Sequence, residues 1–168
     1  MEWETCNRNF IKLNLPSPLR LDFNGFGKLI KSGITDSTKD IMKDAFLPCR
    51  NLLFLVAGAS LAVQIEGSFV SIGLLSEKFA LFPDQKQQFL DSIEITLEAG
   101  LGKKIKVNAP LFDFSKVDVI VLAKQLGIDI DKMYSCHKGG KERCGSCISC
   151  KERIDAMKIL EQLGEGGV

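Results

Sequence analysis

The sequence is poor in several residue types that carry chemistry, with one histidine, one tryptophan and one tyrosine among 168 residues. Its formal net charge is only +1, which argues against a protein that binds polyanions over its whole surface. The N-terminal segment MEWETCNRNF has no basic stretch followed by an apolar one, so it does not resemble a signal peptide. The longest apolar run, Leu52–Val63, is too short to span a bilayer. We therefore expect a cytoplasmic globular protein that does not enter membranes.

Basic residues are nevertheless concentrated in one part of the chain. They are Lys138, Lys141, Arg143, Lys151 and Arg153. We interpret this cluster as a solvated loop, with contact to phosphate or nucleic acid as the alternative. Because no aromatic residues are interleaved with the basic ones, nucleic-acid binding is the weakest of the functions considered.

The spacing of apolar residues predicts strands that alternate with helices. In chain order we expect a strand within 9–23, a buried helix over 50–66, a strand over 68–74, a helix over 84–99, a strand over 104–111, a helix over 115–127 and a final helix whose apolar face is Ile154, Met157, Leu160 and Leu163. Residues 25–44 read as mostly irregular. This order predicts an α/β protein with a parallel sheet. We expect one domain over 1–168, with a sheet portion to residue 130 and a metal-binding subregion over 131–168.

Four of the six cysteines follow the spacing C-x7-C-x2-C-x2-C, at Cys136, Cys144, Cys147 and Cys150. Two residues between thiols is a spacing typical of tetrahedral zinc sites, and Gly145 permits the tight turn that such a site needs. Four thiolates leave no open position on the ion, so the site would be structural rather than catalytic.

Alternatives to this zinc site stay open. His137 could replace Cys136 as a ligand, and C-x2-C-x2-C also occurs in iron–sulfur proteins, although the usual C-x3-C-P continuation is absent. Pairwise disulfides are a further alternative, which a reducing compartment disfavours. The two remaining cysteines, Cys6 and Cys49, lack a partner in this pattern and are expected to be plain buried thiols.

Several segments resemble the 7-cyano-7-deazaguanine synthase family. APLFDFSKVDVIVLAKQLGID (109–129) and YSCHKGGKERCGSCISCKER (134–153) are similar to its C-terminal part. The matching positions are Pro110, Leu111, Lys116, Ser135, Cys136, Cys144, Gly145, Cys147, Cys150 and Arg153. LPCRNLLFLVAGASLAV (47–63) and IGLLSEKFALFPDQKQQFLDSIEITLEAG (72–100) are similar to two further family segments, with Cys49 where glycine is usual. The resemblance covers most of the chain.

This resemblance implies a three-layer, Rossmann-like parallel sheet of the adenine nucleotide alpha hydrolase-like type, truncated, with a zinc-binding helical appendage at its C-terminal end. It implies ATP-dependent conversion of 7-carboxy-7-deazaguanine with ammonia to the nitrile, a step toward queuosine and archaeosine, with Mg-ATP consumed and a homodimer as the assembly. It implies nucleotide or substrate contacts at Arg50, Asn51, Asp84 and Lys116. Each of these four residues could instead have an ordinary surface or capping role, and no residue is assigned as catalytic.

Departures from the family pattern concern the nucleotide site. The family has an SGGxDS loop whose amides bind the ATP phosphates, whereas this sequence has only SGITDS at Ser32–Ser37. Ile34 replaces the second glycine, and a β-branched residue disfavours positive φ, so we interpret SGITDS as unrelated to phosphate binding. Lys86 stands where the family has arginine, and Glu77 is the residue nearest to its acidic position.

We therefore expect the chain to be inactive by itself, and two hypotheses remain open. The chain is either half of a split synthase, completed by a chain that supplies the SGGxDS loop, or a catalytically degenerate, zinc-stabilised binding and assembly module that forms its own dimer.

Overall fold

The structure is a computed structural model, and it describes residues 2–12, 14, 18, 46, 48–137 and 142–165. The chain divides into two compact units, one formed by Met1–Ala45 with Lys116–Val168 and the other by Phe46–Ser115. We call these the terminal unit and the central unit, and each is described by itself. The prediction of one domain with a boundary near residue 130 stays a prediction. The segment 25–44, including SGITDS, lies outside the described residues.

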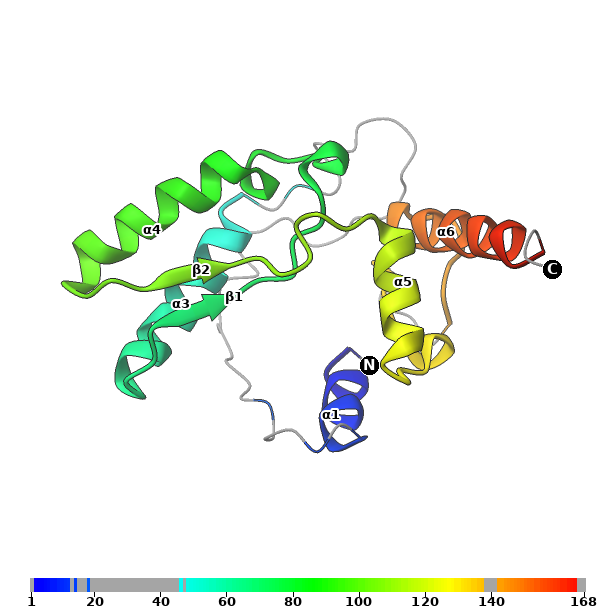
Figure 1. Ribbon diagram of the computed structural model, residues 1–168, viewed down its shortest axis with the longest axis horizontal. Helices are drawn as coiled ribbons and strands as arrows, with labels where there is room; N and C mark the ends of the chain where they lie inside the picture. Colours follow the sequence, from blue (N-terminus) through cyan, green and yellow to red (C-terminus); the bar gives the residue numbers. More distant parts are fainter. Residues whose placement is uncertain are drawn as a thin grey trace. The chain divides into compact units, whose positions relative to one another are not determined.

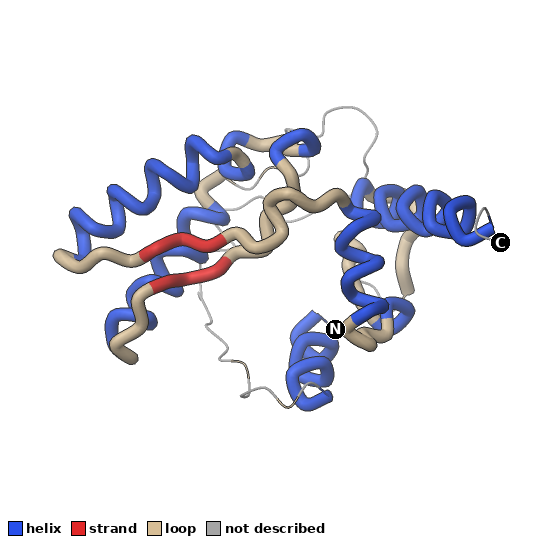
Figure 2. The backbone as a smooth tube through the Cα atoms, viewed as in Figure 1, coloured by secondary structure: helices blue, strands red, loops and turns tan. Residues whose placement is uncertain are grey.

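The central unit contains a small parallel sheet (Figures 1 and 2). Its elements in chain order are α3 (Arg50–Gln64), β1 (Phe69–Ser71), the 3-10 turns η2 (Glu77–Phe79) and η3 (Pro83–Gln85), α4 (Gln87–Leu101) and β2 (Lys106–Asn108). Phe69 pairs with Lys106 and Ser71 with Asn108. Because parallel strands cannot be joined by a tight turn, α4 forms the crossover between them. The α/β class and the predicted strands over 68–74 and 104–111 are confirmed, while the three-layer arrangement stays a prediction.

The core of the central unit lies between its two long helices and the strands. It consists of Leu55, Ala59, Ala62, Ile93, Leu97 and Ile105, each at most 6% exposed. The members from α3 and α4 recur at three- and four-residue spacing, which places them on one face of each helix. Val70 of β1 and Val107 of β2 pack against this core. Phe54 and Val56 of α3 are 53% and 41% exposed, so the prediction that this helix is buried nearly all round is wrong for the part of the chain described.

The residue that precedes α3 has an unusual backbone. Cys49 has φ 62° and ψ 14°, which is the left-handed region. The side chain of an L-residue is crowded in this region and glycine is not, which accounts for the glycine usual in the family at this position. Cys49 is also exposed, so the prediction of a buried thiol is wrong for this residue. The side chain of Cys6 lies outside the described residues.

The terminal unit is helical within its described residues. Its elements are α1 (Glu2–Lys12), α5 (Lys116–Gln125), the 3-10 turn η4 (Ile130–Lys132) and α6 (Ile148–Glu165). Ile120, Ala123, Ile130 and Ala156 form its core, and Met157 and Leu160 pack against it. The predicted helices over 115–127 and at the C-terminal end are confirmed. Ile154 is 41% exposed, so it does not belong to the buried face predicted for α6.

The N-terminal helix corrects a further expectation. Residues 9–12 belong to α1, so the strand predicted within 9–23 is wrong there. The short alternation in NFIKLNL fits a strand and a helix end equally well, and contacts with residues far along the chain favour the helix. Arg8 Nη2 donates to the main-chain oxygen of Lys132 at 3.4 Å, and Lys12 Nζ donates to the main-chain oxygen of Gly127.

None of the helices formed by the described residues has the length and hydropathy needed to cross a membrane.

Candidate metal centre

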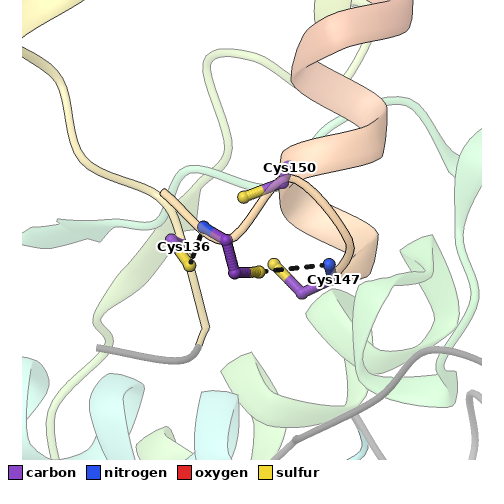
Figure 3. Close-up of side chains that lie close together, drawn as sticks. Cys136, Cys147 and Cys150 are labelled. Carbon is purple, nitrogen blue, oxygen red and sulfur yellow. Dashed lines mark hydrogen bonds between the residues drawn. The ribbon is translucent and has the colours of Figure 1, made fainter. Parts of the chain in front are cut away.

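The four patterned cysteines converge in the terminal unit. The Sγ atoms of Cys136, Cys144, Cys147 and Cys150 all lie within 4.8 Å of one another. Cys136 follows η4, Cys144 and Cys147 belong to the loop before α6, and Cys150 lies in the first turn of that helix (Figure 3). Cys136, Cys147 and Cys150 are at most 2% exposed. Chain segments before and after the loop are thus brought to one buried point.

Backbone amides donate to the sulfurs of this cluster. The amide of Cys144 lies 3.4 Å from Cys136 Sγ, and the amide of Cys147 lies 3.4 Å from Cys144 Sγ (Figure 3). Gly145 has φ 69°, which lets the chain turn tightly between these two donors. The hydroxyl of Ser146 adds a third donor, 3.6 Å from Cys144 Sγ. Donors around a sulfur stabilise its thiolate, which is the form that binds a metal.

The cysteines differ in acidity because their surroundings differ. The Ser146 hydroxyl, followed by the amides of Cys147 and Ser146, lowers the pKa of Cys144 to about 5. Burial raises the pKa of Cys150 to about 12, and the neighbouring Cys147 adds to this effect. Four thiolates this close repel one another, so a full set of charges requires a cation between them.

The donor set fits a metal ion. Four sulfurs at about 2.3 Å from a tetrahedral ion lie about 3.8 Å from each other, which agrees with the observed convergence. The group consists of the four cysteines and does not include His137, which is exposed. None of the described cysteines forms a disulfide. The four thiols could therefore hold a metal ion without help from the histidine, and a four-sulfur set leaves no position for a reacting water.

Polar contacts connect the cysteine loop to the η4 turn. Arg143 Nη2 donates to the main-chain oxygens of Asp131 at 2.7 Å and of Met133 at 2.5 Å. Arg153 of α6 reaches the Asp131 carboxylate at 3.3 Å. Burial, followed by a hydrogen bond with Cys136, raises the pKa of Tyr134 to about 12. These contacts orient the segment that carries Cys136.

Three of the four residues expected in the substrate pocket lie in the central unit. Asn51, 4% exposed, donates from Nδ2 to the main-chain oxygen of Asp84 at 3.2 Å. Phe46 precedes α3 and Phe82 precedes η3. Their rings pack against each other, with centroids 5.2 Å apart. Arg50 Nε is buried and has no hydrogen-bond partner among the described residues. The start of α3 and the η3 turn are thus brought together, and the roles of these residues in binding stay predictions.

Lys116 belongs to the terminal unit instead. Its Nζ lies 3.7 Å from Glu152 Oε2 of α6, and both side chains are partly exposed. Glu77 accepts a hydrogen bond from the amide of Gln87 at 3.2 Å and so caps the start of α4. Lys86, at the position where the family has arginine, is exposed at the N-cap of the same helix.

Sequence reasoning missed the residues that support the cluster rather than form it. Ser146 could have been noticed, because its position inside C-G-S-C places a hydroxyl beside a ligand sulfur. The bonds of Arg143 to main-chain oxygens carry no sequence signal, because any residue provides such an acceptor.

Taken together, the small parallel sheet and the four-thiol cluster define an α/β protein with a candidate structural metal site. A sequence model of the family described as "Queuosine biosynthesis protein QueC" matches residues 2–161. The chain belongs to this family, which confirms the resemblance to 7-cyano-7-deazaguanine synthases.

Curated proteins named 7-cyano-7-deazaguanine synthase are similar to this chain. The protein of Sulfurimonas denitrificans is 31% identical over 157 residues, which cover 88% of this chain and 70% of the relative. That of Caldicellulosiruptor saccharolyticus is 27% identical over 168 residues, covering 95% of this chain and 74% of the relative. That of Methanobrevibacter smithii is 30% identical over 126 residues, covering 75% of this chain and 56% of the relative. Each relative thus has a substantial part that these alignments leave unmatched.

Proposed function

We propose that this chain takes part in 7-cyano-7-deazaguanine synthesis and acts together with a polypeptide segment that supplies the SGGxDS loop. The match to the family over residues 2–161 is the observation that carries this proposal. The sequence contains SGITDS but no SGGxDS, which supports the need for such a segment. The names of the relatives support a role in this pathway. Whether this chain needs a second polypeptide for activity is part of the proposal.

The proposed reaction overcomes the low reactivity of a carboxylate. The carboxylate of 7-carboxy-7-deazaguanine attacks the α-phosphorus of ATP, pyrophosphate leaves, and an acyl adenylate forms. Ammonia displaces AMP and gives the amide. A second ATP adenylates the amide oxygen with release of pyrophosphate, and loss of AMP and two protons leaves the nitrile. Both rounds depend on positioning and on stabilisation of phosphate charge.

The central unit would contribute the base of the pocket. Asn51 fixes the η3 turn through the Asp84 main chain, which leaves the Asp84 carboxylate available to a substrate or to Mg-ATP. The Nε atom of Arg50 is buried and finds no partner in the described part of the chain, and a guanidinium in that state is suited to an anionic group. Lys116 is proposed as a further polar contact to the nucleotide or substrate on the family resemblance alone.

Zinc is the metal proposed for the four-thiol cluster. Zn²⁺ bound by Cys136, Cys144, Cys147 and Cys150 would cross-link the loop before α6 to the segment after η4. An iron–sulfur cluster is the alternative, and the two differ in colour and in metal content.

The test is AMP release by the zinc-loaded chain, given Mg-ATP, ammonia and 7-carboxy-7-deazaguanine. We expect no AMP from the chain by itself, and AMP with nitrile product when a polypeptide carrying the SGGxDS segment of the Sulfurimonas denitrificans protein is added. Product formation by the chain without the second polypeptide would contradict the proposed division of labour.

A catalytically degenerate, dimeric module is the second candidate. The observation in its favour is Lys86, because lysine cannot provide the bidentate contact of the arginine usual in the family. No AMP from a mixture in which the two polypeptides demonstrably bind would favour this candidate.

A further inference from the structure

The two edges of the sheet in the central unit are not equivalent. A side chain of α4 blocks the outer edge of β2. The amide of Lys106 bonds to the oxygen of Ser68, and the amide of Ile72 bonds to the oxygen of Asn108. Because backbone groups alternate in direction along a strand, Val107 of β2 directs its amide away from β1. That amide donates to Glu94 Oε1 of α4 at 2.8 Å.

Glu94 also binds the neighbouring side chain. Its Oε2 lies 3.0 Å from Lys106 Nζ, so the carboxylate is held at the β2 edge by two donors. A strand that added beside β2 would have to displace this carboxylate from the Val107 amide. A side chain that occupies edge backbone groups in this way prevents further pairing.

The outer edge of β1 has no partner strand in the part of the chain that the structure describes. By the same alternation, Phe69 and Ser71 direct their N–H and C=O groups away from β2. Among the described residues these outward groups have no hydrogen-bond partner. Phe69 is 62% exposed, and the segment 68–74 (SFVSIGL) has no charged residue. The edge therefore lacks the charges, prolines and bulges that normally prevent strand addition.

We propose that the outer edge of β1 binds one further parallel strand, supplied by the segment of a 7-cyano-7-deazaguanine synthase that the alignments leave unmatched. The identity of this occupant rests on the proposed function, whereas the difference between the two edges does not. The sheet already packs against α3 and α4, so the incoming strand is needed to pair the free edge of β1 rather than to hold the two strands together. The alignments cover 70% and 74% of the first two relatives, so a segment long enough for more than one strand is unmatched in each.

The chemistry of the edge defines the strand that fits. The outward backbone groups of Phe69 and Ser71 require an extended backbone with alternating donors and acceptors. The exposed Phe69 ring requires an apolar side chain on the matching face of the incoming strand. A parallel sheet is normally covered on both faces, so the incoming segment should also bring a helix or loop.

The experiment co-expresses the full chain with a tagged probe, which is the part of the Sulfurimonas denitrificans protein outside the 157-residue alignment. Amide hydrogen exchange, read residue by residue by NMR, is compared with and without the probe. We expect exchange at Phe69 and Ser71 to slow by about tenfold or more, while exchange at Val107 stays the same. Failure of the probe to bind, or binding without slower exchange at Phe69 and Ser71, overturns the proposal.

Proline substitution separates edge pairing from folding. Ser71→Pro removes an amide that β1 does not use toward β2, so the variant should fold and yet lose most of its binding to the probe. Val70→Pro removes an inward amide and is the matched control, which should lose the sheet itself. Phe69→Lys places a charge on the same edge and serves as the second variant if Ser71→Pro does not fold. Unchanged binding by a folded edge variant overturns the proposal.

Two other occupants are distinguishable in the same measurements. Slow exchange at Phe69 and Ser71 in the free monomer would show that the chain covers its own edge, and slow exchange only in a dimer would show a second copy there. Either result overturns the proposal. Protection by the probe without AMP release leaves this inference intact and contradicts the proposed function. AMP release with unprotected Phe69 and Ser71 contradicts this inference alone.

Discussion

Asn51 and Asp84 are joined through the side chain of the first and the main chain of the second, with Asn51 Nδ2 3.2 Å from the Asp84 oxygen. The two residues therefore have separable roles, because substitution of Asp84 leaves the accepting atom in place. Asn51 is 4% exposed and contributes to the fold, whereas the Asp84 carboxylate is not needed for this bond.

The first prediction concerns this pair. Asn51→Ala should lower the free energy of unfolding by about 1–3 kcal/mol, because a buried hydrogen bond is lost. Asp84→Ala should change it by less than about 0.5 kcal/mol. Urea unfolding followed by circular dichroism measures both. A large loss of stability in Asp84→Ala would show that the carboxylate has a structural role after all.

The second prediction concerns the backbone before α3. Cys49 adopts φ 62°, so Cys49→Gly should raise the free energy of unfolding by about 0.5–1 kcal/mol, after the greater entropy of glycine in the unfolded chain is subtracted. Cys49→Ala keeps the Cβ atom and is the matched control, for which no gain is expected. Thermal unfolding compares the three proteins. Equal gains in both variants would point to the thiol rather than to the backbone.

The third prediction concerns pH. The hydrogen bond from the Val107 amide, followed by that from Lys106, lowers the pKa of Glu94 below 4.5. A carboxyl group with a depressed pKa in the folded state stabilises the fold above its unfolded pKa, and this stabilisation is lost as the pH falls through the folded value. Glu94→Gln should therefore reduce stability at pH 7 and flatten its decline below about pH 4.5. Glu98→Gln, on the exposed side of α4, is the control and should change the free energy of unfolding at pH 7 by less than about 0.5 kcal/mol.

The fourth prediction concerns metal content. The purified chain should contain one zinc ion, and Cys136→Ser or Cys150→Ser should reduce this to less than about one tenth of an ion. His137→Ala should retain the metal, because His137 is not among the clustered groups. Elemental analysis and the colourless spectrum of zinc distinguish it from an iron–sulfur cluster. Loss of the metal in His137→Ala would indicate that His137 is a ligand.

The fifth prediction concerns the support of the cluster. Ser146 Oγ lies 3.6 Å from Cys144 Sγ, so Ser146→Ala should bind the metal about tenfold more weakly. Competition with a coloured chelator measures the affinity, and a cobalt-loaded sample reports the change through its thiolate-to-metal absorption bands. Ser92→Ala, on the exposed face of α4, is the control. An unaltered affinity and unaltered bands would mean that the backbone amides suffice.

The sequence predicted the elements that have strong local signals. The cysteine spacing predicted the four-sulfur cluster because ligand spacing reflects a local turn, and the apolar spacing predicted α3, α4 and both strands. It did not predict α1, because a short alternation does not reveal bonds to Gly127 and Lys132, which are more than 100 residues away. The predicted burial of α3 was too high, because the apolar character of a residue such as Phe54 does not determine whether another part of the protein covers it.

The same limit of sequence reasoning applies to the four residues that are expected to bind the nucleotide or substrate. Arg50, Asn51 and Asp84 were identified through family segments, and the structure joins two of them by a bond that involves a main-chain oxygen. The role predicted for Lys116 by the same resemblance stays a prediction, and within the terminal unit this residue forms an ion pair with Glu152. Spacing along the chain describes local geometry well, and it does not describe how separate units combine.

The bonds of α1 also have a consequence for synthesis on the ribosome. Arg8 and Lys12 are separated from their acceptors by 124 and 115 residues, so α1 leaves the ribosome long before those acceptors exist. At about 5–20 residues per second, the wait lasts roughly 6–25 s. During this interval α1 cannot form these two hydrogen bonds, so the helix is stabilised only by its own residues. A helix this short is marginal by itself in water, and a chaperone that binds unfolded segments would act on it then.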